Sequence, residues 1–262
     1  MKHVVCVKQV PDTTEVKVDE KTGTICREGV ASVLNPFDEF ALNEALRVKG
    51  EGDEVIVVTM GPPQAEEALK KCLAIGADQA ILLCDRAFAG ADTMATSFAL
   101  VKAIQKIGQV DMIFCGQETL DGGTAQVGPE IARQMGFSQA TYVEAVEQIK
   151  GKFAICRKET DDGYERIRAR LPLVVACLPS PDFNPTIPSV MDIIAAKRKV
   201  MTTWTAEDIG GGAEQFGLAG SPTQVVKSYP PPKKGQGVVI QESPGDSVQR
   251  ILELISDKGL IT

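Results

Sequence analysis

The sequence predicts an α/β protein with a doubly wound, mainly parallel sheet, helices on both faces, an antiparallel addition and an extended C-terminal arm. Apolar strand-like runs alternate four times with helix-like segments in the first half, as in parallel sheets covered on both faces. The second half holds a charged hairpin between strand-like runs, and glycine and proline dominate from Thr205. We expect an α/β domain at 1–204 and an arm with a final helix at 205–262.

The strands of the parallel sheet follow from short apolar runs bounded by turn residues. They are expected at Lys2–Lys8, Glu54–Met60, Gln79–Cys84 and Asp111–Cys115. Two short pieces around Val16 and Ile25, joined by Glu20–Gly23, predict a hairpin after the first strand.

Capping residues mark the helices between these strands. Asn35 fits an N-cap before Pro36, with Asp38 as the reciprocal capping partner. Further helices are expected from near Pro63 and from Asp92, which fits a second N-cap.

The second half changes character. Strands are expected at Phe153–Lys158, Arg166–Leu171 and Leu173–Cys177, with the first two forming an antiparallel pair. The prolines of 179–185 exclude regular structure there. A short helix from about Ser189 ends in Lys197–Lys199, whose charges suit a helix C-terminus. The last helix carries an apolar face of Val248, Leu252 and Ile255 that needs a docking surface.

The stretch Gly116–Ile131 is a junction between a strand, a glycine loop and a helix. Such a junction points unpaired N–H groups and the positive end of a helix dipole at one place, which suits a phosphate. Gly122 and Gly123 allow positive φ, and Thr124 can cap the helix or donate to a phosphate. A capped turn without a ligand is equally compatible with these residues, because the loop matches neither GxGxxG nor GxxxxGK[ST].

Composition excludes several classes of protein. A net charge of −7 argues against nucleic-acid binding. No apolar run approaches the ~18 residues of a membrane span, and the N-terminus lacks the layout of a signal peptide. The seven scattered cysteines form no CxxC, which favours reduced thiols in the cytoplasm. The only histidine, His3, lies on the first strand, which disfavours histidine acid–base catalysis.

In a doubly wound sheet, ligands bind beyond the carboxyl ends of the strands, where the strand order reverses. The loops at those ends are Cys6–Val10, Met60–Pro62, Asp85–Thr93 and Gln117–Val127. Two of these four are rich in glycine, so we expect a nucleotide there.

Several motifs together resemble the small (β) subunit of electron-transferring flavoproteins along nearly the whole chain. They are Cys-Val-Lys-Gln at 6–9, Asn-Pro-Phe-Asp-Glu at 35–39, Leu73–Asp78, Gly116–Gly128, Ala195–Lys199 and Ser221–Val225. The resemblance implies an adenine-nucleotide-binding α/β/α fold and a larger α subunit that carries a redox FAD. It also implies that the arm reaches across to that subunit.

The loop Asp121–Gly128 resembles the flavin-bifurcating branch of this family, as does Ala89–Thr93. In that branch the β subunit holds a second FAD that receives a hydride from NADH. One electron goes to ferredoxin or flavodoxin, and the other goes through the α-subunit FAD to a flavin dehydrogenase. Ordinary members have a loop crowded with carboxylates and hold AMP as a structural ligand. A non-bifurcating β subunit with AMP and a stand-alone nucleotide-binding module remain as alternatives.

The resemblance also implies the site residues, while the flavin itself carries the chemistry. The adenosine end would be lined by Cys6, Asn35 and Met60, and weaker candidates for the flavin side are Asp92, Thr93 and Thr96. The diphosphate would be held by Gly123, Thr124, Ala125, Gln126 and Val127.

The segment Pro179–Pro185 departs from the family's recognition segment for acyl-CoA dehydrogenases, so a dehydrogenase of the 2-hydroxy-acid type is also open. Within it, Phe183 is the expected anchor for that partner.

Overall fold

Nine strands form the main sheet, in the order β11-β10-β9-β12-β8-β1-β6-β7-β13. The structure is a computed structural model that describes residues 1–12, 17–18, 25–26, 32–180, 183–226, 237 and 239–260. From β9 to β13 all neighbouring strands are parallel. The four strands expected in the parallel sheet are confirmed as β1 (Lys2–Cys6), β6 (Glu54–Met60), β7 (Gln79–Leu83) and β8 (Met112–Gly116), and the strand expected at Leu173–Cys177 is β12 of the same sheet.

Helices cover both faces of this sheet, as a doubly wound fold requires. One apolar cluster lies beneath α1 (Pro36–Arg47) and α2 (Glu66–Ile75), which follows a 3₁₀ turn at Pro63–Ala65. The other lies beneath α3 (Thr93–Ile107) and α4 (Val127–Met135). Neighbouring residues of a strand belong to opposite clusters, as Val4 and Val5 do, because side chains alternate along a strand.

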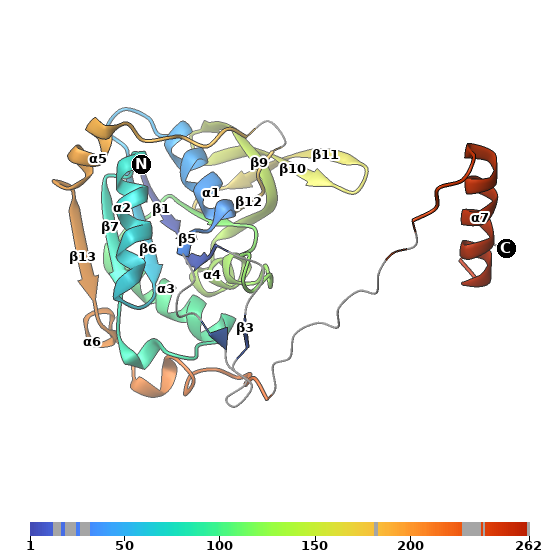
Figure 1. The fold of residues 1–262 in the computed structure, drawn as a ribbon. Helices are drawn as coiled ribbons and strands as arrows, with labels where there is room; N and C mark the ends of the chain where they lie inside the picture. The colour runs from blue at the N-terminus through green and yellow to red at the C-terminus, as the bar shows by residue number, and fades with distance from the viewer. Residues whose placement is uncertain are drawn as a thin grey trace. The chain divides into compact units, whose positions relative to one another are not determined.

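The antiparallel addition is larger than the sequence predicts. The expected pair is present as β10 (Phe153–Thr160) and β11 (Gly163–Arg170), and β10 also pairs with β9 (Ser138–Lys150). Irregular register breaks the period-2 pattern of β9, so that Ala140, Val143 and Val146 are buried at every third position. That spacing hides a strand from a search for period 2. Figure 1 shows this hairpin at one end of the sheet and β13 (Val200–Trp204) at the other.

The first compact unit runs from Met1 to Lys227 and so includes the beginning of the expected arm. After β13, the short helix α6 (Ala206–Ile209) and a 3₁₀ turn at Ala213–Gln215 continue the fold. Phe216 is buried, with its ring centroid 5.3 Å from that of Phe88. Residues 228–262 form a second unit, which contains α7 (Pro244–Asp257). On α7, Val248, Ile251 and Leu252 are exposed, while Leu254 and Ile255 are half-buried.

Short elements flank the core. The hairpin expected near Val16 and Ile25 is confirmed by the antiparallel pair β3 (Lys17–Val18) and β4 (Ile25–Cys26), while its expected turn lies outside the described residues. Strands β2 (Gln9–Pro11) and β5 (Ser32–Leu34) pair antiparallel just before α1. The expected short helix is α5 (Val190–Ala196), capped by Ser189.

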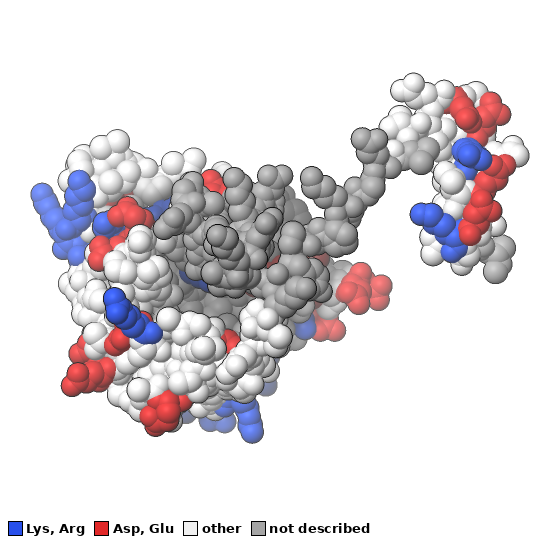
Figure 2. Space-filling model, turned by 60° about the horizontal axis from the view of Figure 1, so that its bottom comes forward, with Lys and Arg blue, Asp and Glu red and all other residues white. Residues whose placement is uncertain are grey.

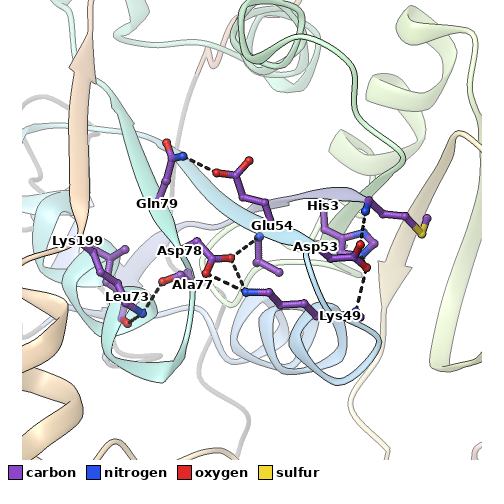
Figure 3. A network of polar contacts seen from close by, with 12 residues as sticks. His3, Lys49, Asp53, Glu54, Leu73, Ala77, Asp78, Gln79 and Lys199 are labelled. Carbon is purple, nitrogen blue, oxygen red and sulfur yellow. Dashed lines mark hydrogen bonds and ion pairs between the residues drawn. The ribbon is translucent and has the colours of Figure 1, made fainter.

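Polar contacts fasten the amino ends of β1, β6 and β7 (Figure 3). Lys49 Nζ lies 2.6 Å from Asp78 Oδ2, which also accepts a hydrogen bond from the Val55 amide. Lys199 donates to carbonyls at the end of α2, so the expected cation at a helix C-terminus serves α2 rather than α5. His3 is fully buried at this edge, and burial lowers its pKa. His3 therefore lies at the opposite edge of the sheet from the carboxyl ends of the strands, where a ligand is expected.

Charged side chains of both signs are mixed on the surface. On the face in Figure 2, Lys and Arg side chains lie in separate small groups among acidic and uncharged ones. Within the described part of the chain, no helix has the length and apolar character needed to cross a bilayer.

Candidate nucleotide site

The strand order reverses between β1 and β8, which places a switch point at their carboxyl ends. Going outward from β1, the chain adds β6 and β7 on one side and then β8 and β12 on the other. In such sheets the loops leaving the two strands at the reversal diverge and leave a crevice for a ligand. The strands end at Cys6 and Gly116, so the loops that follow them form the candidate site.

The three adenosine-end candidates lie at this edge. Cys6 is buried and Met60 half-buried against the same apolar cluster, on the face covered by α3 and α4. Asn35 is fully buried, and its side-chain amide donates to Glu118 O at 2.9 Å. Its Oδ1 accepts from Leu120 N at 3.4 Å. Asn35 therefore joins the start of α1 to the loop after β8, and its side-chain cap on α1 is absent.

The glycine loop has the backbone of an anion site. Gly123 and Ala125 both have positive φ, of 57° and 56°, and Gln126 returns to a right-handed conformation. Alternating hands turn successive N–H groups toward one side, which forms an anion-binding concavity. Gly122 has no positive φ, contrary to expectation. Only glycine, and Asn or Asp to a lesser degree, adopts positive φ easily, so Ala125 is a strained position.

The start of α4 has no side-chain cap. Gln126 occupies the cap position and makes no capping hydrogen bond, so the expected capping by Thr124 is wrong. The first turn contains Pro129, which has no N–H, and the amides of Val127 and Gly128 precede it. Uncapped N–H groups at a helix start need an external acceptor such as water or a ligand.

The flavin-side candidates sit at the start of α3. Thr93 Oγ1 lies 3.2 Å from Gln126 Oε1 and 3.0 Å from Glu130 Oε1, so it joins the starts of α3 and α4. Asp92 caps α3 through Ala95 N, which confirms its expected role as an N-cap. Thr96 is half-buried one turn along, and its amide donates to Asp92 O at 2.9 Å.

Asp92 also anchors the end of the first unit. Its Oδ2 accepts hydrogen bonds from the amide and hydroxyl of Thr223, at 3.0 and 2.7 Å. Burial opposes its charge, but the hydrogen bonds from Ala95 and Thr223 outweigh burial and hold its pKa below the ordinary value. Asp92 is thus occupied with protein partners in this structure.

Asp38 places a buried carboxylate at the switch point, a role that the sequence-based prediction did not include. Asp38 accepts from Lys8 N at 2.8 Å and from Gly116 N at 3.0 Å, so it ties the ends of β1 and β8 together. A Cβ on Gly116 would lie 2.4 Å from Asp38 Oδ1, so this position requires glycine. Burial raises the pKa of Asp38 to about 7. Its position in the first turn of α1 suggested capping, which concealed this role.

Lys8 is the second residue that the prediction missed. Its ammonium group lies 2.7 Å from Asp121 Oδ1, so the side chain spans from the loop after β1 to the glycine loop after β8. The Cys-Val-Lys-Gln motif was the available signal, but it gave no role to the lysine.

The segment after β12 presents a different apolar residue from the one expected. The ring of Phe183 is half-buried and packs edge-on against Phe40, with centroids 4.8 Å apart. Ile187 is 87% exposed, and Val190 and Met191 on α5 are each 72% exposed. Ile187 is therefore much more exposed than Phe183.

Two further observations concern the described residues as a whole. A cleft of about 430 Å³ lies between α3 and residues 214–222, lined in part by Met94 and Phe98. The described residues hold no cluster of three or more His, Cys, Asp or Glu side chains that could bind a metal ion.

Comparison with known proteins places the chain in a family. The electron transfer flavoprotein domain model matches residues 22–209. The caffeyl-CoA reductase-Etf complex subunit CarD of Acetobacterium woodii is 48% identical, covering 97% of this chain and 98% of the relative. The electron transfer flavoprotein subunit beta of Clostridium acetobutylicum is 45% identical over the full length of both chains. Protein FixA of Bradyrhizobium diazoefficiens is 40% identical, covering 97% of this chain and 91% of the relative. The chain belongs to the electron transfer flavoprotein family, as a β subunit.

Proposed function

We propose that this chain is the β subunit of a flavin-bifurcating complex and binds FAD at the β1–β8 switch point. A bound FAD would supply hydride acceptance from NADH and single-electron delivery, one electron to ferredoxin or flavodoxin and one to the α-subunit FAD that feeds a flavin dehydrogenase. The electron-transfer role as a β subunit follows from the family. The choice of FAD and of bifurcation is the proposal.

The observation that carries the proposal is the loop from Gly122 to Gln126. Its alternating backbone and the uncapped start of α4 offer N–H groups to an anion. A Cβ on Gly123 would find its nearest neighbour 3.9 Å away, so the loop leaves room beside the backbone. No carboxylate occurs between Gly122 and Gly128, which removes a source of repulsion toward a diphosphate.

The chain's own residues position such a ligand. Cys6 and Met60 offer an apolar surface at the adenosine end, while Asn35 and Asp38 fix the loops on either side of the switch point. Thr93 brings the start of α3 against that of α4, where a flavin attached to the diphosphate would lie.

The partners proposed are a larger α subunit and a flavin dehydrogenase. The exposed apolar face of α7 needs a docking surface, and the α subunit would supply it. One relative is named as part of a caffeyl-CoA reductase-Etf complex, which favours an acyl-CoA-type dehydrogenase over a 2-hydroxy-acid type. Its contact on this chain would be Ile187 and the neighbouring face of α5.

AMP remains the second candidate ligand, because the uncapped start of α4 would also accept a monophosphate. The cytoplasm is the proposed location, in agreement with free thiols at Cys6, Cys72, Cys84, Cys115, Cys156 and Cys177.

Flavin content per heterodimer tests the proposal. Two flavins support bifurcation, and one flavin with one AMP supports the non-bifurcating alternative. A chain that purifies alone with no flavin would contradict both. Reduction by NADH of a flavin held by this subunit is the second requirement, and its absence in a two-flavin complex would refute bifurcation.

A further inference from the structure

The side chain of Lys8 reaches across the switch point. Lys8 lies just beyond the carboxyl end of β1, and its ammonium group is 2.7 Å from Asp121 Oδ1 in the loop after β8. Asp121 directly precedes the two glycines of the proposed diphosphate loop. A cation is thus stationed at the edge where the ligand's phosphates are expected.

The backbone of Lys8 is fixed on both sides. Its amide donates to Asp38 Oδ2 at 2.8 Å, and its carbonyl accepts from Asn35 N at 2.9 Å. Asp38 and Asn35 are both buried, so this mounting is rigid, while the side chain of Lys8 is 44% exposed. A rigid base with an exposed ammonium group can bind a second anion with little loss of conformational freedom.

We propose that Lys8 is a phosphate-binding residue of this site, and that Asp121 holds its ammonium group in place until the phosphates of a nucleotide take it over. An ammonium group has three donors, so contact with a phosphate oxygen does not require complete loss of Asp121. Phosphate carries more charge than one carboxylate and offers several acceptors, which favours the exchange. Asp38 acts as the positioning residue for this lysine.

The inference rests on the proposed nucleotide site but not on the choice between FAD and AMP, since both carry phosphate. The opposite interpretation is that Lys8 and Asp121 are a structural ion pair that never meets a ligand. The two differ in one respect: only a phosphate-binding lysine distinguishes ligands with phosphate from ligands without it.

The test uses the heterodimer with its α subunit, depleted of nucleotide and titrated by calorimetry with ADP, AMP and adenosine. Lys8→Met should weaken ADP and AMP binding about tenfold to a hundredfold, the range expected for one charge-assisted hydrogen bond. Adenosine binding should stay within twofold. Lys8→Arg, which keeps the charge, should restore most of the loss.

Lys71→Met is the matched control. Lys71 is 43% exposed and its ammonium group lies 2.8 Å from Glu39 Oε2, so it repeats the exposure and pairing of Lys8 away from the loop after β8. This variant should leave all three affinities unchanged. Asp121→Asn should strengthen ADP binding, because it removes a competitor for the ammonium group and a like charge.

Several outcomes would overturn the proposal. Unchanged ADP affinity in Lys8→Met, or an equal loss for ADP and adenosine, would assign Lys8 a structural role. Weaker ADP binding in Asp121→Asn would refute the exchange. A wild-type complex that binds none of the three ligands would refute the site itself.

A complex that carries AMP rather than FAD would remove bifurcation but leave the Lys8 prediction standing. Thermal unfolding is measured for Lys8→Met and for Lys8→Gln. A variant that unfolds at the wild-type temperature but binds ADP more weakly has lost binding rather than its fold.

Discussion

Replacing Gly123 by Asp is the most direct perturbation of the proposed diphosphate loop. Gly123 has a φ of 57°, a region that Asn and Asp enter more readily than other non-glycine residues. An added Cβ would lie 3.9 Å from Glu118 Oε2 and 4.0 Å from Thr119 O, which is ordinary contact. The fold should therefore accept the substitution, at a backbone cost of about 1 kcal/mol together with some repulsion from the Glu118 carboxylate.

The new carboxylate would face the phosphates. Two like charges about 5 Å apart at an effective dielectric constant of about 20 repel by about 3 kcal/mol. A loss of about 3 kcal/mol corresponds to more than a hundredfold in affinity. The electrostatic effect on ligand binding thus exceeds the backbone cost.

Gly123→Asn separates the two effects, since it has the shape and backbone cost of Asp without its charge. The assay is flavin content per heterodimer together with the rate of NADH oxidation. Gly123→Asp should keep its partner and the α-subunit flavin, lose the second flavin and stop oxidising NADH, while Gly123→Asn should keep both flavins. Two retained flavins and normal NADH oxidation in Gly123→Asp would refute the diphosphate assignment. Equal losses in the Asn and Asp variants would show that strain, not charge, is responsible.

Three further predictions concern stability and partners. The folded-state pKa of Asp38 is raised to about 7 from an ordinary 3.8, so its contribution to stability is present at low pH and is lost as pH rises toward 7. In urea unfolding, the difference between wild type and Asp38→Asn should therefore shift against wild type from pH 5 to pH 8, by up to a few kcal/mol; a pH-independent difference would contradict it. Ile187→Ala should slow electron delivery to the dehydrogenase severalfold and leave NADH reduction and melting temperature unchanged, whereas Phe183→Ala should lower the melting temperature because its ring packs on Phe40; the reverse pattern would restore Phe183 as the anchor. Deleting residues 228–262 should abolish co-purification of the α subunit and leave the first unit folded by circular dichroism; an intact heterodimer would exclude α7 as the docking element.

Most strands of the parallel core could be predicted because they are continuous apolar runs separated by helices. Asp92 shows why capping works as a signal: its side chain contacts an amide only three residues away, so sequence spacing alone specifies the contact. The boundary of the first unit could not be found in this way. Residues 205–226 are rich in glycine, yet the burial of Phe216 against Phe88 keeps part of them in the fold, and that contact joins residues far apart in sequence.

Strand β9 could not be predicted from the sequence, for a different reason. Its buried residues Ala140, Val143 and Val146 recur at a spacing nearer to a helix than to a strand, because irregular register turns the chain. Tyr142 has a φ of 57° within this strand, and its amide donates to Gln117 Oε1 at 2.7 Å. A bend fixed by a side chain from another loop leaves no local signature in the sequence.

The candidate site also has one part that is local in sequence and one part that depends on contacts between distant residues. Its tip, Gly123 to Val127, is predicted from features that are local in sequence: the glycines, the helix that follows and the family motif. Its base, formed by Lys8, Asn35, Asp38 and Gly116, depends on contacts between separate loops. The base is held by buried hydrogen bonds to backbone groups, so it would present the same geometry to any adenine nucleotide. Under the proposed function, discrimination between AMP and FAD would then come from the tip and the start of α3, where charge and space can change without disturbing the base. This is why substitution at Gly123 should change which ligand is held, while substitution at Asp38 should change whether the site forms.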